Sequence, residues 1–177
     1  MKKLATLFTL FIFFSVPAFS QLLDDVAAGD FCKTINKIIA EYPAKFETVK
    51  GEEIPEDFLS IWNSKITLST DSKCEVYDVS GDNIWYFEFV CKEDWKATNT
   101  YENLKNNLKM CSYVCGGLTK KEETFENSHT LKRYSLNVLM ELLPGYENYE
   151  YLAIQLDLKK EAEGYRVSIS IGDPTGF

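Results

Sequence analysis

The sequence is poor in the residues that most enzymes use for chemistry at neutral pH. Only one of its 177 residues is a histidine, His129, and its neighbours are polar residues typical of a surface loop. The sequence has no Gly-x-Ser-x-Gly elbow, no phosphate-binding glycine loop and no dinucleotide fingerprint. A nucleophilic site needs a base and an orienting group beside the nucleophile. We therefore assign no catalytic residue, and the sequence favours a protein without catalytic activity over an enzyme.

The spacings that hold metal ions are also missing. No Cys-x-x-Cys pair is present, and zinc sites take four Cys or His ligands at regular spacing. The acidic segments 51–57 and 78–82 lack the alternating ligands and the closing glutamate of a calcium loop. We read the first as a solvated loop and the second as a hairpin turn. The sequence therefore predicts neither a metal nor a cofactor.

The first twenty residues have the pattern of a cleavable signal peptide. Two lysines precede an apolar run from Leu4 to Phe14, and small residues surround the expected cleavage point after Ser20. The apolar run is shorter than the roughly 20 residues that cross a bilayer. We predict a protein exported to the periplasm or the extracellular medium, without membrane insertion after cleavage. Residues 21–177 are then expected to form a single domain.

Basic residues are fewer than acidic ones. The chain has 19 Lys and Arg against 27 Asp and Glu, a net charge of −8. Removal of residues 1–20 takes away two lysines and no acid, so the mature chain carries two fewer positive charges. An acidic surface argues against nucleic acid and against anionic lipid as partners. It is compatible with a protein or small-molecule partner, and acidity also serves solubility.

Five cysteines in an exported chain predict a disulfide framework with at least one thiol left over. Two predicted strands flank the turn-rich segment 80–83. In a hairpin that pairs Ser80 with Trp85, Cys74 lies directly opposite Cys91, within disulfide reach. We therefore predict a Cys74–Cys91 bridge.

The other three cysteines lie on apolar stripes at helical spacing. Cys32 belongs to the first predicted helix, and Cys111 and Cys115 belong to the end of the second. A bridge from Cys32 to Cys111 or Cys115 would connect the two helices. The alternative is that all three are buried thiols, which are common in protein cores.

The periodicity predicts an α+β fold. We expect two helices, at 22–42 and 94–115, packed on one face of a mostly antiparallel sheet, in the order α-βββ-α-βββ. Before the second helix the candidate strands are the short segments 45–50 and 65–69 and the hairpin strands 74–79 and 84–91, of which we expect about three to form. After it we predict strands at 134–142, 151–159 and 165–171, with some edge strand around Thr124-Phe125. The last two strands alternate apolar with polar residues, so we expect one face of the sheet to be polar and open to solvent.

The function favoured by these features is a small exported binding or interaction protein. Its ligand would bind on the open sheet face or at Tyr146, Tyr149 and Tyr151, because exposed tyrosines offer contact area with a polar end. An inhibitor or immunity-like protein that neutralises a basic partner is one specific form of this hypothesis.

Two alternatives come from other classes of protein. An exported hydrolase would use a pair of carboxylates, or a free thiol together with His129. A structural component of the cell envelope would associate with copies of itself.

Overall fold

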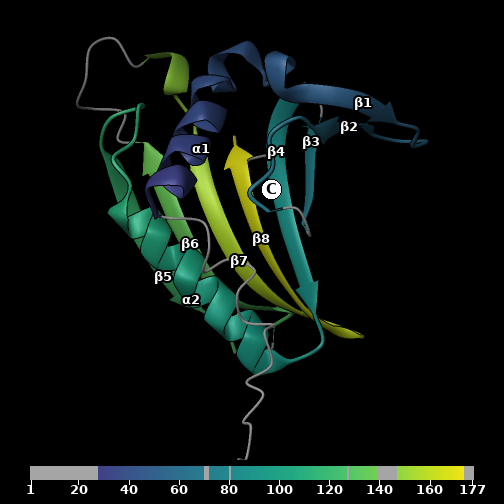
Figure 1. The fold of residues 1–177 in the computed structure, drawn as a ribbon, viewed down its shortest axis with the longest axis vertical. Coiled ribbons are helices and arrows are strands. Elements are labelled where there is room, and N and C mark those ends of the chain that lie inside the picture. Colours follow the sequence, from purple (N-terminus) through teal and green to yellow (C-terminus); the bar gives the residue numbers. More distant parts are fainter. Residues whose placement is uncertain (1–27, 70–71, 80, 127, 139–146, 174–177) are drawn as a thin grey trace, which may run out of the picture.

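The chain folds into one eight-stranded antiparallel sheet with two α-helices (Figure 1). The structure is a computed structural model that describes residues 28–69, 72–79, 81–126, 128–138 and 147–173. Its helices and strands are α1 (Ala28–Ala40), η1 (Tyr42–Ala44), η2 (Glu47–Val49), β1 (Lys50–Ile54), β2 (Ser60–Ser64), β3 (Lys73–Val79), β4 (Asp82–Cys91), α2 (Asp94–Met110), β5 (Leu118–Thr124), β6 (Thr130–Val138), η3 (Glu147–Tyr149), β7 (Ala153–Glu161) and β8 (Gly164–Gly172). The predicted α+β class and antiparallel sheet are confirmed.

Each α-helix precedes a run of four antiparallel strands. The order in the sheet is β1-β2-β3-β4-β8-β7-β6-β5, so the two runs meet where β4 pairs with β8. The predicted three strands per half are therefore corrected to four. Strands β1 and β2 were largely missed, and β5 was expected only as some edge strand around Thr124-Phe125. These strands are short or rich in polar residues, and such strands form because their neighbours pair with them rather than from their own apolar pattern.

Several predicted boundaries were wrong. The first helix ends at Ala40 and the second at Met110, before Cys111 turns into extended backbone. The predicted strand 65–69 is not a strand, and of the predicted strand 45–50 only Lys50 is extended, because Glu47–Val49 forms η2. Strand β1 continues from Lys50 to Ile54, into the segment 51–57 that we expected to be a loop. The β1–β2 hairpin extends away from both helices (Figure 1).

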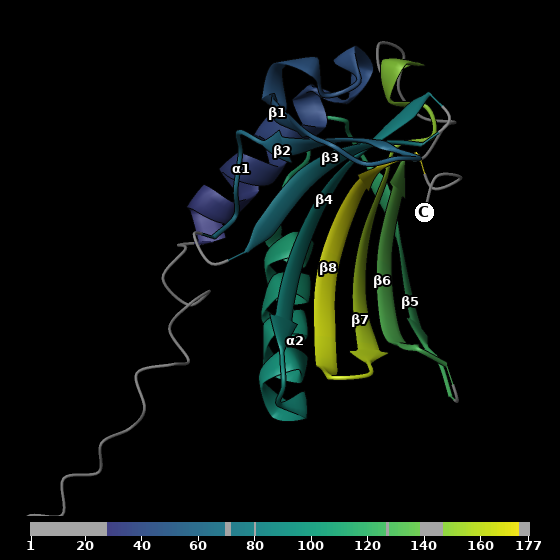
Figure 2. The same ribbon diagram turned by 90° about the vertical axis from the view of Figure 1, so that its right-hand side faces the viewer.

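Both α-helices lie on the same side of the sheet (Figure 2). Helix α2 contacts β4, β7 and β8, and α1 packs on α2. The apolar side chains between them form one core cluster, and its largest fully buried members are Trp85, Tyr101, Tyr134, Phe46 and Phe87. Burying each such side chain stabilises the fold by about 1.5–3 kcal/mol before other terms are counted.

A disulfide bond between Cys32 and Cys111 connects the two helices. Their Cα atoms lie 5.2 Å apart, a separation typical of disulfides. Beside it, Asn36 of α1 donates a side-chain hydrogen bond to the Ser112 carbonyl at 2.8 Å and accepts the Val114 N–H at 2.9 Å. Of the two predicted partners of Cys32, Cys111 is therefore confirmed, and Cys115 is a buried thiol.

The predicted Cys74–Cys91 bridge is wrong, because the hairpin closes more tightly than expected. Val79 pairs with Asp82, and the turn between them is held by the Gly81 N–H donating to the Asp78 carboxylate at 2.8 Å, with Gly81 at φ +95°. This register places Cys74 opposite Phe87, four residues from Cys91. Both thiols are buried and unpaired with each other.

The expected signal peptide at 1–20 lies outside the described residues. Within the described ranges, no helix combines the length with the apolar character that crossing a bilayer requires.

Replacing both Cys32 and Cys111 with serine should lower the free energy of unfolding by about 4 kcal/mol, because the disulfide closes a long loop in the unfolded chain. The cysteines lie 79 residues apart. Urea denaturation of the mature protein measures the loss. Reductant should destabilise the wild type by the same amount and leave the double variant unchanged; an equal response of both proteins would contradict this assignment.

Candidate functional site

The face of the sheet opposite the helices carries a continuous row of polar side chains. Strand register places five of them directly side by side across β3, β4, β8, β7 and β6, in the order Lys73, Glu88, Ser168, Asp157 and Arg133. The row therefore reads cation, acid, serine, acid, cation, with Ser168 on the central strand. Residues that neighbour one another across strands on one face have Cβ atoms close enough to interact.

A hollow of about 440 Å³ lies in this open face. It forms because β8 presents the small side chain of Ser170, next to buried Ser168, while its neighbours present long ones. The side chains that line it are Lys73, Tyr77, Val79, Ile84, Tyr86, Glu88, Arg133, Gln155, Asp157, Lys159, Arg166 and Ser170. A volume between about 300 and 1,000 Å³ is typical of sites for small molecules.

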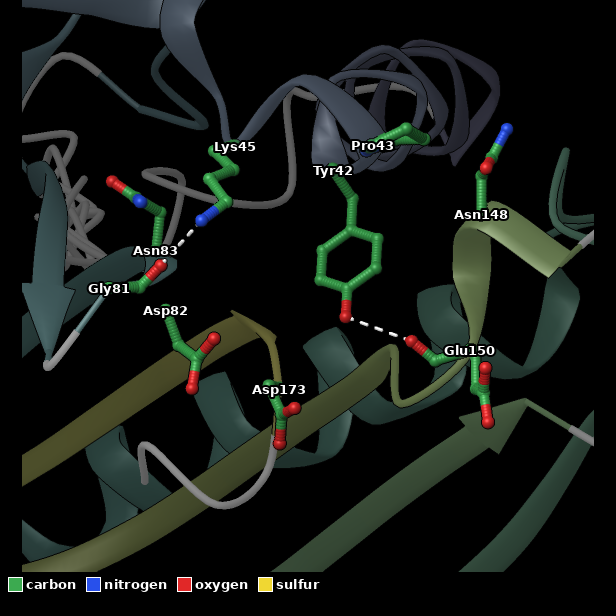
Figure 3. A pocket seen from close by; sticks show the side chains of 9 residues that line it. All are labelled: Tyr42, Pro43, Lys45, Gly81, Asp82, Asn83, Asn148, Glu150 and Asp173. Carbon is green, nitrogen blue, oxygen red and sulfur yellow. Dashed lines mark hydrogen bonds between the residues drawn. The ribbon is translucent and has the colours of Figure 1, made fainter.

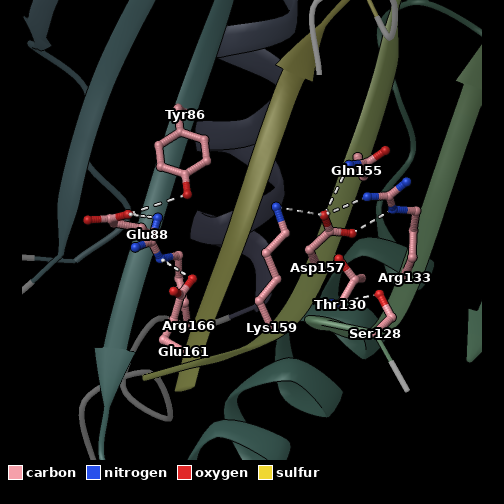
Figure 4. Close-up of polar contacts among 10 residues, drawn as sticks. All are labelled: Tyr86, Glu88, Ser128, Thr130, Arg133, Gln155, Asp157, Lys159, Glu161 and Arg166. Carbon is pink, nitrogen blue, oxygen red and sulfur yellow. Dashed lines mark hydrogen bonds and ion pairs between the residues drawn. The ribbon is translucent and has the colours of Figure 1, made fainter. Parts of the chain in front are cut away.

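One group of charges lies on the β7 side of the hollow (Figure 4). The Asp157 carboxylate accepts two hydrogen bonds from the Arg133 guanidinium, at 2.8 and 3.0 Å, and one from Gln155 at 3.1 Å. Lys159 approaches the same carboxylate at 3.5 Å. The hydrogen bonds that Arg133 donates to Asp157 raise the pKa of the guanidinium, which therefore stays protonated.

A second group lies on the β4 side (Figure 4). Arg166 forms ion pairs with Glu88 at 3.4 Å and with Glu161 at 3.3 Å, and the Tyr86 hydroxyl donates to Glu88 at 3.3 Å. Burial raises the pKa of Tyr86, although hydrogen bonds with Ser168 and Arg166 oppose it. The phenol therefore remains neutral at neutral pH.

A third carboxylate, Glu75 of β3, lies beneath the aromatic side of the hollow. It accepts a hydrogen bond from the Tyr77 hydroxyl and pairs with Lys73 at 2.8 Å. Burial lowers the pKa of Lys73, but its hydrogen bond and charge contact with Glu75 outweigh burial, so that pKa is raised. The rings of Tyr77 and Tyr86 meet edge to face, with centroids 5.6 Å apart.

The charges of the open face are layered. The Glu75 and Asp157 side chains are only 2% and 3% exposed, whereas Lys73 is 53% exposed and Lys159 is 35% exposed. Carboxylates form the floor and cations reach solvent above them. A buried carboxylate is costly unless it is paired, which explains why each one has a cation beside it.

The tyrosines predicted to bind a ligand lie elsewhere, at the end of the sheet. Tyr146 is outside the described residues. Tyr149 is partly buried and stacks on Tyr42 with ring centroids 6.4 Å apart, and Tyr151 is 57% exposed at φ +68°. Tyr149 therefore packs against another ring while Tyr151 is exposed, and neither lines the open-face hollow.

A smaller hollow of about 190 Å³ lies beside Tyr42 (Figure 3). The Tyr42 hydroxyl donates to the Glu150 carbonyl at 3.0 Å. Burial, together with the charges of Asp173, Asp82 and Glu150, raises the pKa of Tyr42 to about 12. Among the described residues, no group of three or more His, Cys, Asp and Glu side chains is arranged to hold a metal ion.

The residues of a thiol-based site are not brought together. The backbone carbonyl of His129 accepts a hydrogen bond from the Lys160 backbone N–H at 2.7 Å, beside the β7–β8 turn. His129 lines a shallow hollow to which no cysteine contributes. Burial raises the pKa of Cys74 and of Cys91, and it raises the pKa of Cys115 to about 11. A thiol is a nucleophile only as the thiolate, so these environments suppress reactivity.

Comparison with protein-family models, with curated proteins and with solved structures found no match for this chain. The geometry of the open face is therefore the basis on which a function is assigned.

Replacing Arg133 with glutamine should lower the free energy of unfolding by about 2 kcal/mol, because it leaves the buried Asp157 without its main partner. The matched control is Lys121→Gln on β5, whose pair with Glu123 is exposed and should be worth less than about 1 kcal/mol. Thermal and urea denaturation measure both changes. Equal, small losses in the two variants would contradict the importance of the buried pair.

Alkylation of the unreduced protein at neutral pH should modify three thiols, and only after denaturation, because all three are buried. Mass spectrometry counts the labels. A single reactive thiol after denaturation would indicate that Cys74 and Cys91 are bridged after all, and rapid labelling of the native protein would indicate an activated thiol.

Proposed function

We propose that the mature protein is an exported binding protein that holds a small organic ligand in the hollow of the open sheet face. The observation that carries this proposal is the convergence of polar and aromatic side chains from five strands on a single hollow of about 440 Å³. Binding sites for small molecules combine such a concavity with a few well-placed polar groups.

Export to the periplasm or the extracellular medium is part of the proposal. The pattern of residues 1–20 supports it, and so does the Cys32–Cys111 disulfide, because disulfides form and persist in oxidising compartments.

The arrangement of charges gives less support to a hydrolase. A pair of catalytic carboxylates needs one member that stays protonated to act as the acid. Glu88 and Asp157, which flank Ser168 on the open face, each form an ion pair with an arginine, at 3.4 and 2.8 Å, and neither lies in the apolar surroundings typical of a catalytic acid.

The rigid, paired side chains of the hollow suit binding without large rearrangement. Asp157 holds Arg133 in place through two hydrogen bonds, and Glu88 and Glu161 hold Arg166 between them. A preorganised site avoids part of the entropic cost of fixing side chains when a ligand binds.

A fragment screen by nuclear magnetic resonance tests this function. Isotope-labelled mature protein is mixed with small organic compounds that are anionic, cationic or neutral. Compounds that bind should shift the amide signals of β3, β4, β7 and β8 around the hollow. Replacing Ser170 with tryptophan should abolish these shifts, because the new ring would occupy the hollow.

The matched control is Thr119→Trp, an exposed position on β5 that does not line the hollow. It should bind the same compounds as the wild type. The proposed function is wrong if no compound shifts the open-face signals, or if the two tryptophan variants behave alike.

A further inference from the structure

We infer that the open-face hollow selects an organic anion, with its charged group beside Ser170 of β8 and an aromatic or apolar body against the tyrosines of β3 and β4. This inference rests on the proposed function, and it adds the chemical class of the ligand. Its physical basis is the difference between the charges that a ligand can reach and those that it cannot.

The reachable charges are positive. Lys73, Lys159 and Arg166 are each at least a third exposed at their side chains, whereas Glu75 and Asp157 are almost fully buried beneath them. Glu88, at 17%, is covered by its pairing with Arg166. An entering ligand therefore meets ammonium and guanidinium groups first, and the carboxylates only through them.

The cations retain donors for a ligand. An arginine has five N–H donors and a lysine three. Asp157 takes two hydrogen bonds from Arg133, from Nε and Nη2, which leaves the geometry of the guanidinium fixed. Lys159 stands directly opposite Arg166 in the strand register, so their positive groups belong to one region of the hollow. Charge-assisted hydrogen bonds to an anion are about twice as strong as neutral ones.

The centre of the hollow can receive the head of the ligand closely. Ser170 lines the hollow with a small side chain that carries a hydroxyl donor, whereas Ser168 beside it is buried and forms a hydrogen bond with Tyr86. In strand register Ser170 lies between Tyr86 on β4 and Gln155 on β7. A carboxylate or sulfonate beside Ser170 would face Lys159 and Arg166.

The other wall of the hollow is aromatic and apolar. Tyr77 and Tyr86 pack edge to face, and Ile84 and Val79 line the hollow beside them. Burial raises the pKa of both phenols, so they add no negative charge at neutral pH that would repel an anion. Rings of this kind stack on aromatic ligands with offset or edge-to-face geometry.

The rest of the molecule makes this local positive field selective. The chain carries a net charge of −8, so its general surface repels anions. An anion is attracted where the cations reach solvent over buried acids, and the attraction between partly exposed charges weakens as salt screens it.

Three probes with the same ring system and different charge test the inference on the mature protein. Indoleacetate is an anion, indoleacetamide is neutral and tryptamine is a cation. Titration followed by nuclear magnetic resonance should show indoleacetate binding in the hollow at millimolar or lower concentration, with the amide at least about tenfold weaker and tryptamine weaker still.

A lysine pair on one strand provides the matched variants. Lys159→Gln, on the open face, should weaken indoleacetate binding by about threefold to tenfold and leave indoleacetamide binding unchanged, whereas Lys160→Gln, exposed on the opposite face, should change neither. Asp157 keeps its bonds with Arg133 in the first variant, so the fold is expected to persist.

The inference is overturned if tryptamine or the amide binds the hollow as tightly as indoleacetate, or if the two β7 variants have equal effects. It is also overturned if none of the three probes binds there. In each case the proposed function survives when the fragment screen finds other compounds on the open face, and it fails separately when the screen finds none.

Discussion

The antiparallel pairing of β4 with β8 is the contact on which the rest of the structure depends. It joins two runs of four strands into one sheet. On the helix side its register aligns Phe87 with Ile169 and Phe89 with Val167, which builds the core under α2. On the other side the same register aligns Glu88 with Ser168. Because strand side chains alternate between faces, a shift of one residue would bury the polar row and expose the apolar one.

The cost of burying carboxylates shapes the open face. Glu75 and Asp157 are almost fully removed from water, and each is compensated by a cation and by hydrogen bonds from neutral donors. A stable protein does not need such groups, since apolar residues would serve burial as well. On a solvent-facing hollow, these buried carboxylates hold Arg133, Lys73 and Lys159 in fixed positions through their ion pairs.

The sequence predicts the parts of this fold that follow from local periodicity. Helical spacing led to a bridge from Cys32 to either Cys111 or Cys115, of which the structure contains the first, and the alternation in β7 and β8 led to a polar open face. The Cys74–Cys91 bridge was wrong because hairpin register depends on one turn, and Gly81 with Asp78 makes that turn tighter. Strands β1 and β2 carry little apolar pattern of their own.

The candidate site could not be predicted from the sequence, because its residues come together only through the pairing of distant strands. The row from Lys73 to Arg133 depends on the registers of four successive strand pairs, each set by turns and packing that no single segment contains. The signal that was available lay in the small outward residues Ser168 and Ser170 among longer neighbours. The sequence instead predicts ligand binding at the clustered tyrosines, although Tyr149 packs against Tyr42.

A crystal structure of the mature protein grown with indoleacetate tests the central claim most directly. We expect electron density in the open-face hollow, with the carboxylate directed toward Lys159 and Arg166 beside Ser170, and the ring against Tyr77 and Tyr86. Density that reverses this orientation, or an empty hollow in crystals that hold the compound at another surface, would contradict it.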